Sequence, residues 1–149
     1  MKTRIKTVAI SVMVLVMLLT GCFTKRYYKG PIRKQSEIAV IDTQATMAHL
    51  GYWIWPSISS IDGVGTGKSK IYDSMRRLKR FEVLPGKHTL RVTIVSGSAE
   101  RGTYTPYLKP LIFTALAGRG YVVQIIKDNQ KGWKPVIIDR ESKVSVHLQ

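Results

Sequence analysis

The chain has 149 residues, one cysteine and a formal charge of +15, from 24 Lys and Arg against nine Asp and Glu. This length suffices for one domain with a modest core, and a single cysteine excludes a disulfide within the chain. So basic a chain favours anionic partners such as lipid headgroups, lipopolysaccharide phosphates, wall polymers or nucleic acid, although charges scattered for solubility would give the same total.

The first 21 residues have the composition of an export signal. Lys2, Arg4 and Lys6 supply positive charge, and a nearly unbroken apolar run follows from Val8 to Leu19. A membrane-spanning helix needs about 20 apolar residues, so this run is too short to span well. We therefore expect a signal-peptide helix; the alternative is an uncleaved N-terminal anchor.

The apolar run ends in Leu19-Thr20-Gly21-Cys22, which resembles the lipobox of bacterial lipoproteins. The resemblance implies that the Cys22 thiol receives a diacylglycerol, that the chain is cut after Gly21, and that the new amino terminus is acylated. Several acyl chains on one residue anchor a protein stably, whereas one chain holds only marginally. Phe23 stands where an Asp would resemble an inner-membrane retention signal, so the resemblance favours the outer membrane, facing the periplasm. Export also makes nucleic acid the least expected partner.

Residues 22–36 are predicted to be a basic tether between the lipid and the domain. They contain the paired tyrosines Tyr27 and Tyr28, and a Gly30-Pro31 pair that breaks regular structure. We expect little regular structure here. The Lys and Arg side chains either touch anionic headgroups, each contributing about 1 kcal/mol near a charged surface, or belong to a plain flexible spacer.

The first strands are predicted after this tether. Glu37 to Asp42 is a short run with β-branched residues, which indicates a strand. Residues 43–52 are ambiguous between a loop and one helical turn. The two tryptophans of the stretch at residues 53–56 (WIWP) suit either core packing, which we favour, or a membrane-interface wedge. Ile58 to Ile61 predicts the next strand, and Asp62-Gly63 is a hairpin turn signal.

The stretch GVGTGKS at residues 63–69 nearly matches a phosphate-binding loop. That motif requires four residues between its first Gly and the Gly-Lys-Ser, but Gly63 leaves three, and the required position holds Asp62. A carboxylate there would repel phosphate, and no alternation of strands and helices surrounds it. The sequence therefore predicts a hairpin loop and not a nucleotide site.

Residues 70–80 (KIYDSMRRLKR) combine apolar side chains at helical spacing with a cluster of cations. The segment suits either a short amphipathic helix or a loop-like insertion. Its candidate contacts with an anionic surface are Arg76, Arg77, Lys79 and Arg80. Since isolated helices under about 12 residues are marginal, we favour a connector packed on the domain.

The second half of the chain shows the period-two alternation of half-buried strands. The clearest example follows the Pro85-Gly86 turn, where Leu90, Val92 and Ile94 alternate with polar residues. Such a strand has one face in a core and one in water.

Further strands are predicted at the same spacing, with residues 96–106 as a loop between them. Pro135 interrupts one of the strands and indicates a sheet edge. The predicted strands of this half are 80–84, 88–95, 108–116, 121–127, 133–139 and 143–148. The whole pattern favours a mainly β fold, a small antiparallel β-sandwich or barrel, over residues 37–149.

Four stretches carry a second resemblance: SIDG at 60–63, FEVLPGKHTLRV at 81–92, FTALAGRGY at 113–121 and GWKPVIID at 132–139. Together they resemble a group of small bacterial lipoproteins of unassigned function, and the middle part is similar to short PEGA-type β-sandwich surface modules. The resemblance implies a cell-envelope β domain and supplies no catalytic residues.

Catalytic and metal-binding patterns are weak. The three histidines, His49, His88 and His147, lie far apart and lack metal-ligand spacing. No Gly-x-Ser-x-Gly elbow occurs, and we expect His88 to be an exposed or edge residue and not a base. We expect no cofactor or metal. The sequence favours a structural or interaction module held at the membrane, with a binder of anionic lipid, glycolipid or wall polymer as the alternative and a cryptic hydrolase as the third hypothesis.

Overall fold

The computed structural model describes residues 24–49, 52–67, 79–97, 102–128 and 132–148. The predicted signal helix, the lipobox residues 19–22, and Arg76 and Arg77 lie outside these ranges. Within them, the regular structure consists of strands and one 3-10 turn, η1 (Gln35–Glu37). No helix in this part of the chain has the length and apolar character needed to cross a membrane.

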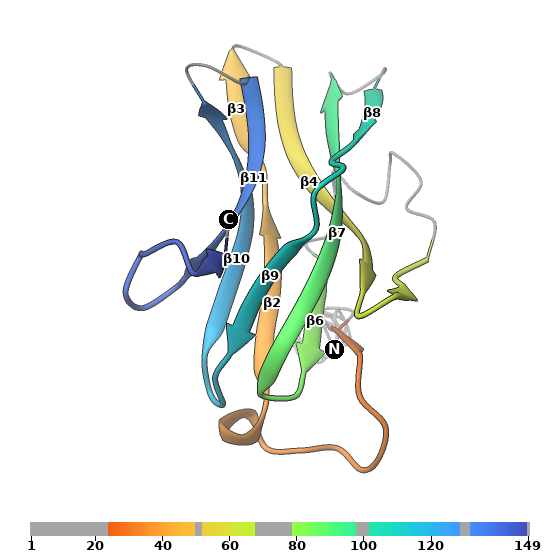
Figure 1. Ribbon diagram of the computed structural model, residues 1–149, viewed down its shortest axis with the longest axis vertical. Helices are drawn as coiled ribbons and strands as arrows, with labels where there is room; N and C mark the ends of the chain where they lie inside the picture. Colours follow the sequence, from red (N-terminus) through yellow and green to blue (C-terminus); the bar gives the residue numbers. More distant parts are fainter. Residues whose placement is uncertain (1–23, 50–51, 68–78, 98–101, 129–131, 149) are drawn as a thin grey trace, which may run out of the picture.

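The strands form two facing sheets, which confirms the predicted mainly β sandwich (Figure 1). The first sheet has the order β1 (Thr24–Arg26), β6 (Arg80–Val83), β2 (Ala39–Gln44), β10 (Gly120–Asp128) and β11 (Gly132–Asp139). The second has the order β12 (His147–Leu148), β9 (Leu111–Ala115), β7 (Gly86–Gly97), β4 (Tyr52–Ile61) and β3 (Thr46–His49), with β5 (Val64–Gly65) on β4 and β8 (Gly102–Pro106) on β7. Most neighbours are antiparallel, but β1 with β6 and β2 with β10 run parallel.

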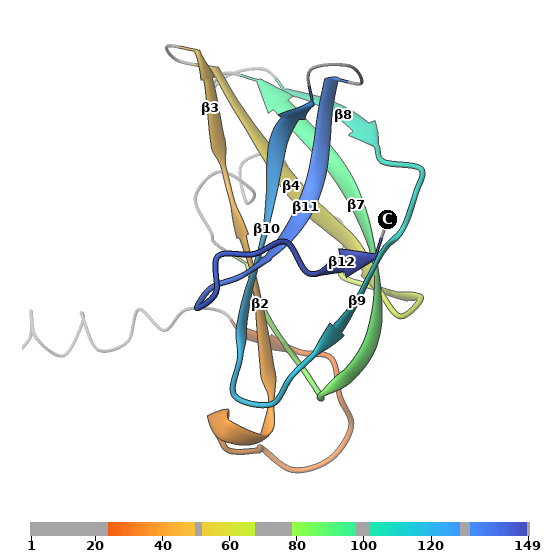
Figure 2. The ribbon, with the colours of Figure 1, turned by 60° about the vertical axis from the view of Figure 1, so that its left-hand side comes forward.

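One long extended segment joins the two sheets. β2 pairs with β6 and β10 in the first sheet, and after a single residue β3 pairs with β4 in the second (Figure 2). The Thr46 hydroxyl also donates to the Ile125 carbonyl of β10, 2.8 Å away. The expectation of a loop or helical turn is therefore wrong for residues 43–49, because Thr43 and Gln44 pair with the distant β10 and β3 pairs with the neighbouring β4.

Two turns follow the glycine signals of the sequence. Asp62 and Gly63 have φ of 50° and 79°, and a type I′ hairpin turn requires a positive φ at both central positions. They connect β4 to β5, where Ile61 lies opposite Val64. Gly86, which follows Pro85, also has a positive φ of 137° and begins β7.

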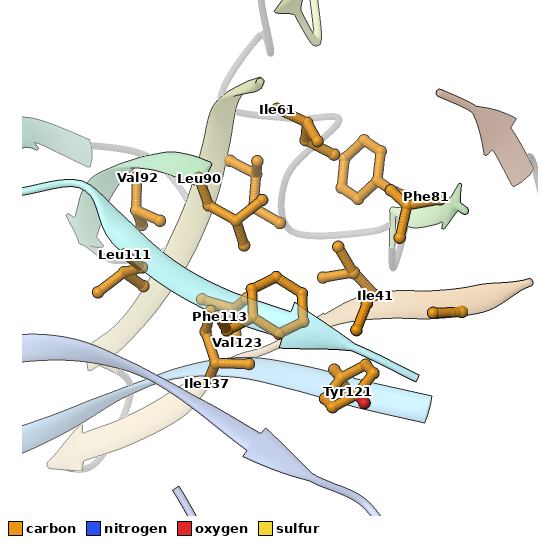
Figure 3. Packing of buried hydrophobic residues seen from close by; sticks show 14 residues of the cluster. Ile41, Ile61, Phe81, Leu90, Val92, Leu111, Phe113, Tyr121, Val123 and Ile137 are labelled. Atoms are coloured by element: carbon orange, nitrogen blue, oxygen red, sulfur yellow. The ribbon is translucent and has the colours of Figure 1, made fainter. Parts of the chain in front are cut away.

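The core lies between the two sheets (Figure 3). Leu90 and Val92 of β7 are buried in it, as the alternation predicts, while Arg91 between them is exposed. Phe113 of β9 and Tyr121 of β10 meet edge to face, with ring centroids 5.1 Å apart. The buried cluster comprises Ala39, Ile41, Ile58, Ile61, Phe81, Val83, Leu90, Val92, Leu111, Phe113, Ala115, Tyr121, Val123 and Ile137. Burial of each large side chain contributes about 1.5–3 kcal/mol, so this cluster is the main stabilising feature.

The sheet margins confirm two expectations and correct a third. Pro135 lies in β11, the edge strand of the first sheet, and the end of the last predicted strand, 143–148, forms as β12 beside β9. Residues 96–106 are not a continuous loop. Ser96 and Gly97 extend β7, and β8 pairs with that extension. Pairing between Ser96–Gly97 and Gly102–Thr103, which the local sequence does not reveal, makes these described residues strand.

Candidate functional site

β1 fastens the first described residues to the sandwich, where the sequence predicts an irregular tether. Thr24–Arg26 run parallel to β6, and the Tyr27 amide continues the pairing by donating to the Glu82 carbonyl at 2.8 Å. The Lys25 ammonium donates to the Thr66 carbonyl at 3.0 Å. Because β6 belongs to the first sheet and Thr66 follows β5 of the second, β1 connects to both sheets.

Aromatic contacts hold the residues after β1 in place. The Tyr27 ring packs edge to face against Phe81, with centroids 5.6 Å apart. The Tyr28 hydroxyl lies 3.4 Å from the Glu82 carboxylate and accepts a 3.5 Å hydrogen bond from the Arg33 amide. The path from β1 to η1 is therefore attached to the body at several points.

Cations gather along β1, the start of β6 and the loop that leads to η1. We define the basic edge as Lys25, Arg26, Lys29, Arg33, Lys34, Lys79 and Arg80. Arg80 lies opposite Thr24 in the β1–β6 register, so the fold brings Lys79 and Arg80 beside the cations of the predicted tether. The other two predicted contacts, Arg76 and Arg77, lie outside the described residues.

A second surface is apolar and lies on the outer face of the second sheet, at its β3–β8 end. Met47 and Trp53 are opposite each other in the β3–β4 register, and Trp55 shares their face because alternate residues of a strand do. In the same sheet, Val95 lies between Trp55 and Tyr104. Met47, Trp53 and Tyr104 are 54%, 39% and 41% exposed. We call Met47, Trp53, Trp55 and Tyr104 the aromatic face.

The direction of this face follows from the neighbouring row of the sheet. Thr46 and Ile54 are register partners, and Thr46 bonds to the opposite sheet, so this row points inward and Met47 and Trp53 point outward. The two tryptophans share this face but differ in exposure: Trp55 is buried, whereas Trp53 is 39% exposed. The Trp55 indole N–H is buried and has no hydrogen-bond acceptor among the residues that the structure describes. The expectation of core packing is therefore wrong for Trp53, and Trp55, although buried, does not belong to the cluster between the two sheets.

His88 is buried, so the expectation of an exposed or edge residue is wrong. It lies on β7, which has β9 and β4 as neighbours. Its Nδ1 is 2.6 Å from an Asp62 carboxylate oxygen, and its Nε2 is 2.7 Å from the Leu84 carbonyl oxygen. The other Asp62 oxygen accepts the Thr89 amide at 2.8 Å. Asp62 and His88 thus tie the β4–β5 turn to the start of β7.

This geometry makes His88 a structural link. A general base needs an unengaged ring nitrogen near the substrate, but both nitrogens of His88 face oxygens of the chain itself. The His49 ring stacks on Tyr52, with centroids 4.9 Å apart. Among the described residues, no group of three His, Cys, Asp or Glu side chains could hold a metal ion.

Asp139 ends β11 and organises the turn that follows. Its Oδ1 accepts the amides of Glu141 and Ser142, both at 2.9 Å, and the Arg119 guanidinium lies 3.7 Å away. The backbone hydrogen bond from Ser142 is the largest cause that lowers the pKa of Asp139 below its ordinary 3.8, and the Glu141 amide and the Arg119 charge add to it, while burial opposes them.

An Asp139→Asn variant should lose less of its stability on acidification than the parent chain does. Because the folded pKa lies below the unfolded one, the carboxylate stabilises the fold fully above about pH 5, and this contribution is lost as the pH falls through the folded pKa. Asn keeps an acceptor oxygen without the charge, so we expect a loss of about 1 kcal/mol at neutral pH that shrinks in acid. Urea unfolding across this pH range measures it. Glu37→Gln, at an exposed carboxylate, is the control, and parallel profiles for the Asp139 variant and the parent would contradict the prediction.

Comparisons with protein-family models, curated proteins and solved structures find no match to this chain. The chemistry of its own residues therefore carries the functional argument.

Proposed function

We propose that this chain is a lipoprotein of the bacterial cell envelope, held by acyl chains on Cys22, and that its β-sandwich acts as a structural or interaction module. The observation that carries the proposal is the stretch at residues 19–22 (LTGC), which ends a charged and apolar leader and contains the only cysteine. Phe23 favours the outer membrane, on the periplasmic side.

The aromatic face is the surface we propose for an envelope protein partner. Exposed Met47, Trp53 and Tyr104 share one side of a rigid sheet, and aromatic and Met side chains are enriched at protein interfaces. A photo-crosslinking residue in place of Trp53 should give a discrete adduct in living cells. The same residue at exposed Thr114 should not, and matching adducts at both positions would count against this surface.

The basic edge supports the alternative, a binder of anionic lipid, glycolipid or wall polymer. Its seven cations come from two segments far apart in the sequence, which the β1–β6 pairing brings together. Attraction of this kind is screened by salt. Binding of the anchored protein to an anionic polymer should therefore weaken as the ionic strength rises. Binding that does not change with ionic strength would contradict this alternative.

A Cys22→Ser variant should move from the membrane fraction to the soluble fraction or accumulate as a longer precursor. Each buried methylene contributes about 0.8 kcal/mol, so losing the acyl chains removes far more membrane affinity than scattered surface charges supply. Fractionation with intact-mass spectrometry measures both outcomes. Thr20→Ser keeps a small residue in the predicted cleavage site and should stay anchored. An unmodified Cys22 thiol on an intact leader in the parent protein would overturn the proposal.

A further inference from the structure

The anchor proposed above would join the sandwich with almost no spacer. Cys22 precedes Thr24, the first residue of β1, by two positions. A residue spans at most about 3.6 Å, so the two Cα atoms are within about 7 Å of each other. A lipid on Cys22 would therefore place the start of β1 next to the headgroup layer.

β1 is fixed to the sandwich and does not act as a flexible linker. It pairs with β6 along its whole length, Lys25 bonds to the Thr66 carbonyl, and the Tyr27 ring packs against the core at Phe81. Releasing β1 would break all of these contacts at once. The body must then follow the anchor, and the side that carries β1 must face the bilayer.

The charge on that side matches an anionic surface. Residues 24–37 contain Lys25, Arg26, Lys29, Arg33 and Lys34 and a single acidic residue, Glu37. Lys79 and Arg80 extend the cluster, and the nearby Glu82 already faces the Tyr28 hydroxyl. By contrast, the chain has no Lys or Arg between Lys34 and Lys68, a span that includes β2 to β5. Positive charge is therefore dense along the β1 side and missing from the β3–β4 hairpin, while further cations such as Lys87, Arg91 and Lys109 lie elsewhere on the sandwich.

An exposed apolar side chain lies within the same cluster. Ile32 is 78% exposed, and Lys29, Arg33 and Lys34 surround it in the sequence. Large apolar side chains flanked by cations are typical of segments that lie in the membrane interface. The loop that carries Ile32, drawn in orange, runs along the end of the body opposite to β3 and β8 (Figures 1 and 2).

We propose that the basic edge, with Ile32, is the membrane-facing surface, and that its cations contact the phosphates of anionic phospholipid headgroups. The inference rests on the anchoring proposed above. Phospholipid is favoured over wall polymer because the two-residue connection from Cys22 holds the start of β1, with Lys25 and Arg26, next to the headgroups. The sandwich thus has a fixed orientation, with the aromatic face held in water and away from the bilayer.

Site-specific probes on the full, acylated chain in vesicles test this orientation. Acylation consumes the Cys22 thiol, so a cysteine introduced elsewhere is the single labelling site. A fluorophore on Ile32→Cys should be quenched several-fold more by headgroup-depth spin-labelled lipid than one on Met47→Cys, in vesicles containing phosphatidylglycerol. Equal quenching at the two sites would overturn the proposal. Protein that never enters the vesicle fraction would show instead that the anchor itself fails.

Charge variants test the role of the cations. Neutralising Lys29, Arg33 and Lys34 to Gln should reduce the difference between the two probes, and high salt should do the same, while the short anchor keeps the remaining part of the difference. A matched control neutralises three exposed cations elsewhere, Arg91, Lys109 and Lys127, and should leave the difference intact. The same difference in purely zwitterionic vesicles, or one that arises only when an anionic wall polymer is added, would overturn the assignment to phospholipid.

Discussion

A Phe113→Ala variant should unfold with a free energy about 3–5 kcal/mol lower than the parent chain, the largest loss we expect from one side chain. Phe113 is 1% exposed and lies in the middle of the core, where its ring meets Tyr121 edge to face. Its ring centroid is also 6.0 Å from that of His88. Removing the ring leaves a cavity between β9, which carries Phe113, and the side chains of Tyr121 on β10 and His88 on β7.

Because small domains are stable by only about 5–15 kcal/mol in total, this loss would leave the variant close to unfolding at ambient temperature. Urea titration followed by tryptophan fluorescence measures it as a fall in the transition midpoint. Phe113→Leu keeps most of the volume and should lose much less. Leu116→Ala, at a side chain that is 54% exposed, is the surface control. An Ala variant at position 113 as stable as this control would show that the buried cluster is not the main support of the fold.

The strands that carry this core could be predicted from local pattern alone. Leu90 and Val92 alternate with polar residues, and burial on one face is what such alternation means for any sheet. The Asp62-Gly63 turn was equally local, because few other residue pairs tolerate positive φ at both positions. Pro135 could be assigned to an edge since proline lacks the N–H that an inner strand must donate.

The pairing of strands could not be predicted in the same way. β1 is extended because β6, far along the chain, offers it hydrogen-bond partners, and β3 and β8 pair with the neighbouring strands β4 and β7. The residues of β1 and β3 alone do not encode these pairings. The two parallel pairings, β1 with β6 and β2 with β10, likewise join strands that are far apart in the sequence, so local pattern does not predict them.

The candidate surfaces depend on that pairing, so the sequence indicated their residues but not their arrangement. Lys79 and Arg80 were candidates as part of one basic segment, yet they lie beside the cations of β1 only because β6 accepts β1 as a neighbour. The sequence shows Trp53 and Trp55 as a pair, but their position beside Met47 and Tyr104 depends on the pairing register of β3, β4, β7 and β8. For His88 the sequence predicts an exposed or edge position, because it cannot show the Asp62 carboxylate and the Leu84 carbonyl that bond to the buried ring.

A His88→Ala variant should be destabilised by about 2–3 kcal/mol, the second large loss we expect. The change leaves the Leu84 carbonyl without its donor and opens a cavity beside Phe113. It also removes one partner of the Asp62 carboxylate. Since the Asp62 side chain is 46% exposed, water can replace its lost hydrogen bond to His88. Most of the loss in stability therefore comes from the unpaired Leu84 carbonyl and the cavity beside Phe113.

An Asp62→Asn variant removes the carboxylate charge but keeps a side chain that can bond to His88 and to the Thr89 amide. An Asn amide can donate to His88 Nδ1 while its oxygen still accepts the Thr89 amide, and a neutral ring can still donate from Nε2 to Leu84. Asn also tolerates the positive φ at this position, so we expect a loss of only about 1 kcal/mol. In the double variant the two losses should not add, because residues that share a hydrogen-bond network are coupled. Strict additivity in urea unfolding would mean that Asp62 and His88 stabilise the fold independently, and the turn would then owe its position to backbone pairing alone.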